Sequence, residues 1–292
     1  MFFLRHMNLE RFSSYKSQLW AICAYVNPLL CSKFLVAKAL FGKADLGNRE
    51  DVQEVVCASI GNLAISIAYF AHLHCVRATM FLPNNVPDRV KELVEFLGAK
   101  TVVCEGVKLK SEVEPVARAY ANETKGALYL DQFDIVECGR VYTETVFDPL
   151  LSMLPFDPAK RPVVVLAPFG TGGLFFAACS FVQKLAGKNH KVVPVGLYVN
   201  HEPDKQLFDF VCAQYPSLDI LSYQCSDIGQ AFGAFDEMSL LLELPFGVVS
   251  AVTMAHAVAQ MNQDQEVVVL PVLTDSVLSS VFFAQPSTDC CC

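Results

Sequence analysis

The chain has 292 residues, of which 53% are hydrophobic and only 18% charged, a balance typical of a globular protein that buries a sizeable core. Its apolar runs are shorter than the roughly 18–20 residues of a membrane-crossing helix, so we expect no membrane association. The net charge of −8, without a visible basic patch, disfavours nucleic acids and anionic membranes as partners.

The 12 cysteines form no C-x-x-C pair and mostly lie in apolar segments, where a free cysteine behaves as a small hydrophobe. We therefore expect reduced core thiols, a cytoplasmic location and no metal site. His72, His74 and Cys75 resemble a metal cluster, but residues i and i+2 of a helix point to different faces. The N-terminus is too short and too charged for a secretory signal. The terminal Cys290-Cys291-Cys292 is expected to be a frayed tail, with lipidation as the alternative.

Continuous apolar runs alternate with helical patterns along the chain, as expected of strands that are covered on both faces. The predicted strands are Trp20–Val26, Val55–Ala58, Ala78–Leu82, Thr101–Cys104, Leu128–Asp131, Val163–Ala167, Val192–Val199 and Val267–Leu273. The clearest helix is Pro87–Leu97, in which apolar residues recur at i, i+3, i+4 and i+7 and which Gly98 ends. This alternation predicts parallel sheets with right-handed crossovers.

We expect an α/β fold with two domains, each a mainly parallel twisted sheet with helices on both faces. Residues 34–142 would form a smaller domain, and residues 1–33 together with 143–292 a larger one. The stretch Leu151–Pro162 carries three prolines and is the expected hinge or linker.

The first candidate for chemistry is Lys33, which follows the first predicted strand and precedes an apolar helix, Phe34–Phe41. A lysine with few charges around it can have a nucleophilic amine, because desolvation disfavours the charged form. The alternative is an ordinary surface lysine. Lys38 is a competitor that we expect on the exposed face of the same helix.

The second candidate is the segment Ala58-Ser59-Ile60-Gly61-Asn62, between a predicted strand and the helix Leu63–His72. Ser59 can cap that helix. The free amides of the loop could equally seat a substrate carboxylate, with the Ser59 hydroxyl as a donor. The residues alone leave both interpretations open.

The third candidate is Gly170-Thr171-Gly172-Gly173, between a predicted strand and the apolar helix Leu174–Leu185. Glycines at this junction let backbone amides turn toward an anion, and the start of the helix adds partial positive charge. The pattern is neither a Walker A loop nor a G-x-G-x-x-G motif, so it suits a single phosphate ester. The alternative is a tight turn that permits close strand–helix packing.

In order and spacing, these segments resemble those of fold-type II, or tryptophan-synthase-β-like, pyridoxal-phosphate enzymes of the cysteine synthase and serine/threonine dehydratase branch. Asn27-Pro28-x-x-Cys31-x-Lys33 resembles their N-P-x-G-S-x-K segment, and Lys33 falls on the Schiff-base lysine. Ser59-x-Gly61-Asn62 resembles their S-x-G-N loop, which implies that Ser59, Gly61 and Asn62 bind the substrate and that Asn62 hydrogen-bonds the cofactor's ring oxygen.

The resemblance continues toward the C-terminus. Gly170–Gly173 resembles the G-T-G-G phosphate cradle, and Gln132-Phe133 resembles a Gln-Phe pair after the last strand of the small domain, which implies that Gln132 binds substrate. Thr274-Asp275-Ser276 follows the last predicted strand, so Ser276 would be the serine that faces the pyridine nitrogen. Together these matches cover residues of about 20–283, nearly the whole chain.

The resemblance implies a pyridoxal 5'-phosphate enzyme that performs β-replacement or β-elimination on a small amino acid, such as serine, threonine or O-acetylserine. It also implies a homodimer. Lys33 would hold the cofactor and then act as the general base, and the small domain would close over the substrate.

Several positions depart from the family pattern. They are Leu29, Leu30, Cys31, Phe34, Leu35, Leu63 and Asp134, together with a reduced serine-rich helix start at Gly247–Ser250. Contacts to the cofactor are therefore better preserved than contacts to the substrate. The pattern fits an altered substrate, or a catalytically impaired relative that acts as a binding or regulatory protein. A nucleotide-binding α/β protein is a weaker alternative, because no G-x-G-x-x-G motif is present.

Overall fold

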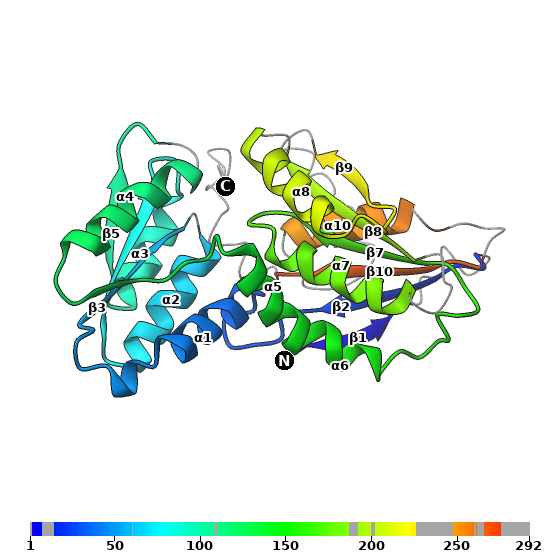
Figure 1. Ribbon diagram of the computed structural model, residues 1–292, viewed down its shortest axis with the longest axis horizontal. Helices are drawn as coiled ribbons and strands as arrows, with labels where there is room; N and C mark the ends of the chain where they lie inside the picture. Colours follow the sequence, from blue (N-terminus) through cyan, green and yellow to red (C-terminus); the bar gives the residue numbers. More distant parts are fainter. Residues whose placement is uncertain are drawn as a thin grey trace, which may run out of the picture. The chain divides into compact units, whose positions relative to one another are not determined.

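The computed structural model describes residues 2–7, 15–59, 61–107, 110–186, 192–199, 202–225, 248–259, 261 and 266–275. The chain divides into two compact units (Figure 1). The larger unit contains the described residues of 1–32 and 133–277, and the smaller unit contains those of 33–132.

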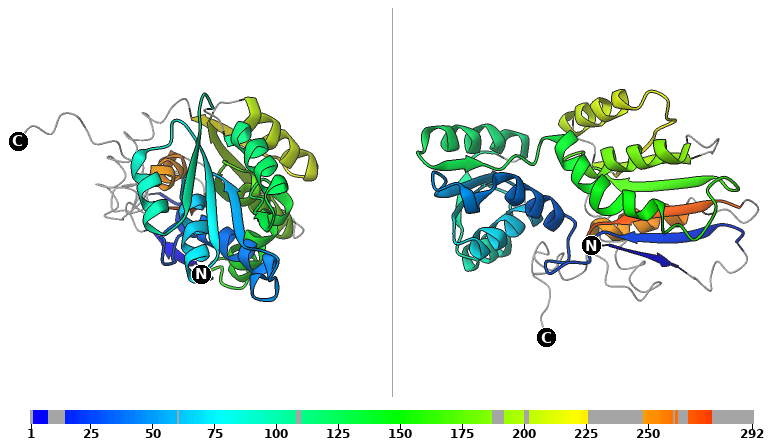
Figure 2. Two further views of the ribbon diagram at one scale, coloured as in Figure 1. Left: turned by 90° about the vertical axis from the view of Figure 1, so that its left-hand side faces the viewer. Right: turned by 60° about the horizontal axis from the view of Figure 1, so that its bottom comes forward.

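The larger unit is built on a six-stranded sheet with the order β1-β2-β10-β7-β8-β9. Its strands are β1 (Phe3–His6), β2 (Gln18–Cys23), β10 (Val268–Leu273), β7 (Val163–Pro168), β8 (Val192–Val199) and β9 (Leu221–Cys225). All neighbours are parallel except β1, which pairs antiparallel with β2 at the edge of the sheet (Figure 2).

Helices cover both faces of this sheet. They are α5 (Ile135–Tyr142), a π-helical turn (Thr143–Phe147), α6 (Asp148–Leu151), α7 (Gly173–Ala186), α8 (Glu202–Gln214) and α10 (Val248–Ala259). The chain moves in one direction across the sheet through β7, β8 and β9 and then returns to β10. Because crossovers are right-handed, α7 and α8 lie on one face and α10 lies on the other.

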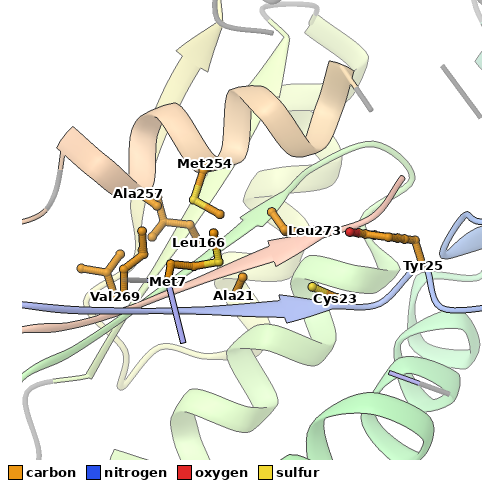
Figure 3. Close-up of a cluster of buried hydrophobic side chains, with 10 residues drawn as sticks. Met7, Ala21, Cys23, Tyr25, Leu166, Met254, Ala257, Val269 and Leu273 are labelled. Carbon is orange, nitrogen blue, oxygen red and sulfur yellow. The ribbon is translucent and has the colours of Figure 1, made fainter. Parts of the chain in front are cut away.

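The face under α10 shows why the strands read as continuous apolar runs. Met254 and Ala257 of α10 point toward Leu166 of β7 and Val269 of β10 (Figure 3). The residues directly before and after Leu166 and Val269 along the strands face the opposite side of the sheet and are also buried. A strand that is covered on both faces has no polar face to alternate with its apolar one.

The smaller unit is a four-stranded parallel sheet with the order β5-β4-β3-β6. Its strands are β3 (Glu54–Ala58), β4 (Arg77–Pro83), β5 (Lys100–Cys104) and β6 (Ala127–Tyr129), and its helices are α1 (Lys33–Ala44), α2 (Asn62–Leu73), α3 (Asp88–Phe96) and α4 (Lys110–Glu123), with a 3-10 turn at Leu46–Asn48. Helices α2 and α3 follow the chain from β3 to β5. The return to β6 places α4 on the opposite face.

The fold class expected from the sequence is confirmed, and every predicted strand is present within a few residues. Three differences concern the units. Lys33 was expected in the larger domain but is the first residue of the smaller unit. Helix α5 packs on α7 and belongs to the larger unit, although residues up to 142 were expected in the smaller domain. The segment Leu151–Pro162, the expected hinge, joins α6 to β7 inside the larger unit. Prolines therefore mark an irregular connection here and not a domain boundary.

Candidate active site

Three of the candidate segments belong to the carboxyl edge of the larger sheet. Residues 24–32 follow β2, Thr274 and Asp275 follow β10, and residues 169–172 follow β7. These strands are adjacent and parallel, so their carboxyl ends meet at one edge. The chain leaves β7 toward β8 and returns from β9 to β10, which makes the β7–β10 boundary a topological switch point, the usual ligand position in open α/β sheets.

The segment before Lys33 is a compact loop fastened to β10. The Asn27 side chain accepts hydrogen bonds from the amides of Leu29 (3.2 Å) and Cys31 (3.4 Å) and donates one to the Cys31 carbonyl (2.8 Å). The Ser32 amide donates to the Thr274 carbonyl at 2.7 Å. The Asn27 side chain therefore stabilises the loop through hydrogen bonds to its backbone. The end of β10 holds the peptide that leads into Lys33.

Leu30 has a left-handed backbone, with φ at 51°. It occupies the position where the N-P-x-G-S-x-K segment has glycine. A side chain in this region costs roughly 1–2 kcal/mol, which glycine avoids. The backbone at Leu30 therefore has a conformation that suits glycine better than leucine.

Replacing Leu30 with glycine should therefore cost less than the same change at the neighbouring leucine. We expect Leu30→Gly to lower the free energy of unfolding by roughly 1 kcal/mol less than Leu29→Gly, because both half-buried side chains are lost but only Leu30 is relieved of strain. Urea unfolding measures this change. Leu29→Gly is the matched control, because Leu29 lacks a positive φ. Equal destabilisation of both variants would contradict the expectation.

Lys33 is the first residue of α1 and is half-buried, whereas Lys38 on the same helix is exposed. The neighbouring departure at Phe34 has a packing explanation. Its ring lies 5.0 Å from that of Phe70 and 6.1 Å from that of Tyr69, centroid to centroid, which joins α1 to α2. The aromatic residue at this position therefore contributes to the core of the smaller unit.

The Ser59 loop lies at the carboxyl end of β3, beside the end of β6. These two adjacent strands form the switch point of the smaller sheet. The Ser59 hydroxyl accepts hydrogen bonds from the amides of Gly61 and Ala64, each at 3.2 Å. Ser59 therefore supports the start of α2 through these two amides, although the N-cap position itself is Gly61. Gln132 lies on the same edge and donates from its side-chain amide to the Ala58 carbonyl at 2.5 Å.

Asn62 differs from these two residues. It is the first residue of α2 and half-buried, and its backbone carbonyl accepts from the Ser66 hydroxyl at 2.7 Å. Its side-chain amide makes no hydrogen bond within the described residues. Among the polar side chains of this loop, Asn62 is the one that the fold leaves available to a ligand.

The glycine turn is tightly packed at its end and exposed at its start. A Cβ at Gly173 would lie 2.7 Å from the Cβ of Cys138, and one at Gly139 would lie 2.5 Å from the Phe176 ring. Helices α5 and α7 therefore approach each other closely at these two glycines. Gly172 has φ at 86°, a conformation that favours glycine.

The first part of the turn is open. Gly170 is exposed and has no atom within 4 Å of an added Cβ, and Thr171 is half-buried. The first amides of α7 lack acceptors one turn earlier in the helix, and the helix dipole favours a negative charge there. A turn of this shape, with a hydroxyl at Thr171, has the donors that a phosphate ester requires.

Other candidate positions have different outcomes. Ser276 and Ile60 lie outside the described residues. Asp134, which stands where the family pattern has asparagine, caps α5 by accepting from the Glu137 amide at 3.0 Å. Asp275 and Ser250 form a buried hydrogen-bonded pair that the sequence did not reveal as such. The sequence marked only the reduced serine-rich helix start at Gly247–Ser250.

Cys23 at this edge is disfavoured as a nucleophile. Burial raises the pKa of Cys23, at the end of β2, to about 12. All cysteines of the described ranges that the structure places are free thiols. Within the described residues, no group of three or more His, Cys, Asp and Glu side chains is arranged to hold a metal ion. The described part of the chain contains no helix that is long and apolar enough to span a membrane.

The chain belongs to the family of pyridoxal-phosphate dependent enzymes, which it matches over residues 6–216. It is 25% identical over 136 residues to cysteine synthase A of Escherichia coli (strain K12), covering 46% of this chain and 41% of that protein. It is 31% identical over 132 residues to L-threonine ammonia-lyase of Geobacter sulfurreducens, covering 44% and 30%.

The fold agrees with this membership. The crystal structure of O-ureido-L-serine synthase superposes with a TM-score of 0.79, covering 99% of this chain and 95% of the other at 16% identity. In sequence, by contrast, the chain matches about two fifths of the length of the E. coli cysteine synthase. Cofactor and fold therefore follow from the family, whereas the reaction and the substrate do not.

Proposed function

We propose that the protein is a pyridoxal 5'-phosphate enzyme that performs β-elimination or β-replacement on a small amino acid, with serine, threonine and O-acetylserine as the first substrates to test. The observation that carries this proposal is the carboxyl edge of the larger sheet. There the loop that leads into Lys33, the end of β10 and the glycine turn after β7 belong to three adjacent parallel strands at a topological switch point.

Each candidate residue has a defined task. The amides of the turn at Gly170–Gly173 and the Thr171 hydroxyl would hold the phosphate. Lys33 would hold the cofactor covalently as a Schiff base and, once released, move the α-proton of the substrate. When bound, the cofactor supplies an electron-withdrawing ring that stabilises negative charge on the substrate.

The loop of the smaller unit would contribute the remaining contacts. The Asn62 amide would donate to the cofactor's ring oxygen. The Ser59 hydroxyl already accepts two amide hydrogen bonds, so its proton is what it can offer to a substrate carboxylate. Gln132 would act by holding the Ala58 carbonyl and so fixing the loop. Ser276 would face the ring nitrogen as a neutral hydroxyl.

The wider setting is also part of the proposal. The reduced state of the described cysteines supports a cytoplasmic location, since that compartment keeps thiols reduced. The resemblance implies a homodimer, and we propose this state for the chain. Mass measurement by light scattering tests it, and a monomer with bound cofactor would refute that part alone.

The reaction is tested by adding single amino acids to the cofactor-loaded protein. We expect at least one of serine, threonine and O-acetylserine to change the absorbance of the cofactor and to release pyruvate, 2-oxobutyrate or acetate. The absence of product from all three, with the cofactor bound, would contradict the proposed activity.

A second candidate function is a cofactor-binding regulatory protein without turnover. This candidate is favoured by the small number of polar side chains that the loop in the smaller unit leaves for contact with a substrate. Gln132 is engaged with Ala58, and Leu63 is 2% exposed where the family pattern has threonine. Bound cofactor together with unchanged absorbance in the presence of every amino acid tested would favour this second candidate.

A further inference from the structure

A buried polar pair lies at the carboxyl edge of the larger sheet, and the tasks assigned above use neither of its members. Ser250 is in the first turn of α10 and is 0% exposed, and Asp275 follows β10 and is 5% exposed. Polar groups this deeply buried cost free energy unless they are hydrogen-bonded. The partners of this pair therefore indicate what it does.

The hydroxyl of Ser250 is fully used inside the chain. It lies 2.6 Å from Asp275 Oδ1 and 2.9 Å from the Asp275 carbonyl, and its single proton goes to the closer, charged acceptor. It also accepts from the amides of Thr274 (2.9 Å) and Asp275 (3.0 Å). One donated and two accepted bonds exhaust a hydroxyl, so Ser250 has none left for a ligand.

The carboxylate of Asp275 completes the connection to α10. Its Oδ1 also accepts from the Ser250 amide at 2.9 Å. A negative charge in the first turn of a helix interacts favourably with the helix dipole. The pair thus joins the start of α10 to the end of β10 by four hydrogen bonds that involve side chains.

The same two residues at the end of β10 hold the loop that leads into Lys33. Asp275 forms an antiparallel bridge with Cys31, and the Thr274 carbonyl accepts from the Ser32 amide at 2.7 Å. Lys33 is the next residue along the chain. An unbroken series of contacts therefore runs from α10 through the Ser250–Asp275 pair to the peptide before Lys33.

We propose that the Ser250–Asp275 pair positions Lys33. It acts through the loop, by fixing the strand end to which the backbone before Lys33 is fastened. The proposal rests on the proposed function only in naming what Lys33 reacts with. The mechanical part of the proposal concerns the loop itself and is testable without any cofactor.

The first experiment measures hydrogen exchange in the cofactor-free protein. In Asp275→Asn and in Ser250→Ala we expect the amides of Asn27 and of residues 29–32 to exchange at least about tenfold faster, because a charge-assisted hydrogen bond that holds the strand end is weakened. Asp157→Asn is the matched control, since Asp157 accepts from the Ala159 amide at an exposed turn. Faster exchange confined to α10 and β10 would overturn the proposal.

The second experiment separates phosphate binding from the reaction of Lys33. Pyridoxine 5'-phosphate has no aldehyde and reports binding without a covalent link, whereas borohydride reduction followed by mass spectrometry reports the link between Lys33 and pyridoxal phosphate. In Asp275→Asn we expect unchanged binding of pyridoxine phosphate and labelling of Lys33 that is about tenfold to a hundredfold slower, as a misplaced reacting group predicts.

Two results would overturn the proposal: an equal loss of both signals, which indicates general damage, or unchanged labelling. Ser250→Ala is measured in parallel, so that poor folding of one variant does not decide the outcome. Failure of the parent protein to bind either compound would instead refute the proposed function, and the exchange experiment would still decide whether the pair holds the loop.

Discussion

Lys33→Ala is expected to abolish the visible absorbance of the protein purified in the presence of pyridoxal phosphate and to lower product release by at least about a hundredfold. The first effect follows because the absorbing species requires the amine of Lys33. The second follows because general base catalysis contributes about 10²–10⁴-fold to such reactions. Absorbance spectroscopy and a coupled assay for pyruvate or 2-oxobutyrate measure the two effects.

The matched control for this variant is Lys38→Ala. Lys38 is on the same helix but exposed, so its removal should leave both signals unchanged. Borohydride reduction of the parent protein should label the peptide that contains Lys33. Retention of the absorbance in Lys33→Ala, or labelling at a different lysine, would assign the cofactor link to another residue and remove the basis of the proposed function.

Gly173→Ala is expected to have the second largest effect, on stability. The added Cβ would lie 2.7 Å from the Cβ of Cys138 and 3.2 Å from the backbone of α5, so α5 and α7 must move apart. Overpacking of this kind costs about 1–3 kcal/mol. Urea unfolding should show the loss, and binding of pyridoxine 5'-phosphate should weaken, because the first amides of α7 shift with the helix.

The neighbouring glycine provides the comparison. Gly170 has no positive φ and no atom within 4 Å of an added Cβ, so Gly170→Ala should change the free energy of unfolding by less than about 0.5 kcal/mol. The two variants carry the same added methyl group in the same turn. Equal stability of the two would show that the contact between α5 and α7 does not constrain this turn.

Most strands could be predicted from the sequence because strands buried on both faces of a parallel sheet consist of continuous apolar residues. Val192–Val199 was placed with its observed limits, and Val55–Ala58 missed one residue. The strands that were missed are β1 and β9. Both lie at the edges of the larger sheet, and Phe3–His6 is exposed at three of its four positions. An edge strand of this kind lacks the pattern on which the other predictions relied.

The residues of the candidate site also differ in whether a local sequence pattern marks them. Lys33, Asn62 and the glycine turn could be proposed as site residues because motif spacing along the chain marks them. The buried pair of Ser250 and Asp275 was not found, because hydrogen bonds between residues 25 positions apart leave no local signal. The packing role of Gly173 also depends on a partner, Cys138, that only the tertiary structure brings near.

The antiparallel strand β1 has a consequence for the behaviour of the protein at high concentration. Within the described part of the chain it pairs with β2 alone, so one row of its backbone amides and carbonyls is not used by the sheet, a template onto which another chain could add. The strand is short, and Arg5 and His6 are exposed on it. Short length and charge are the features by which natural edges discourage such addition. Replacing Arg5 and His6 with apolar residues should therefore promote self-association into fibres through the edge of β1.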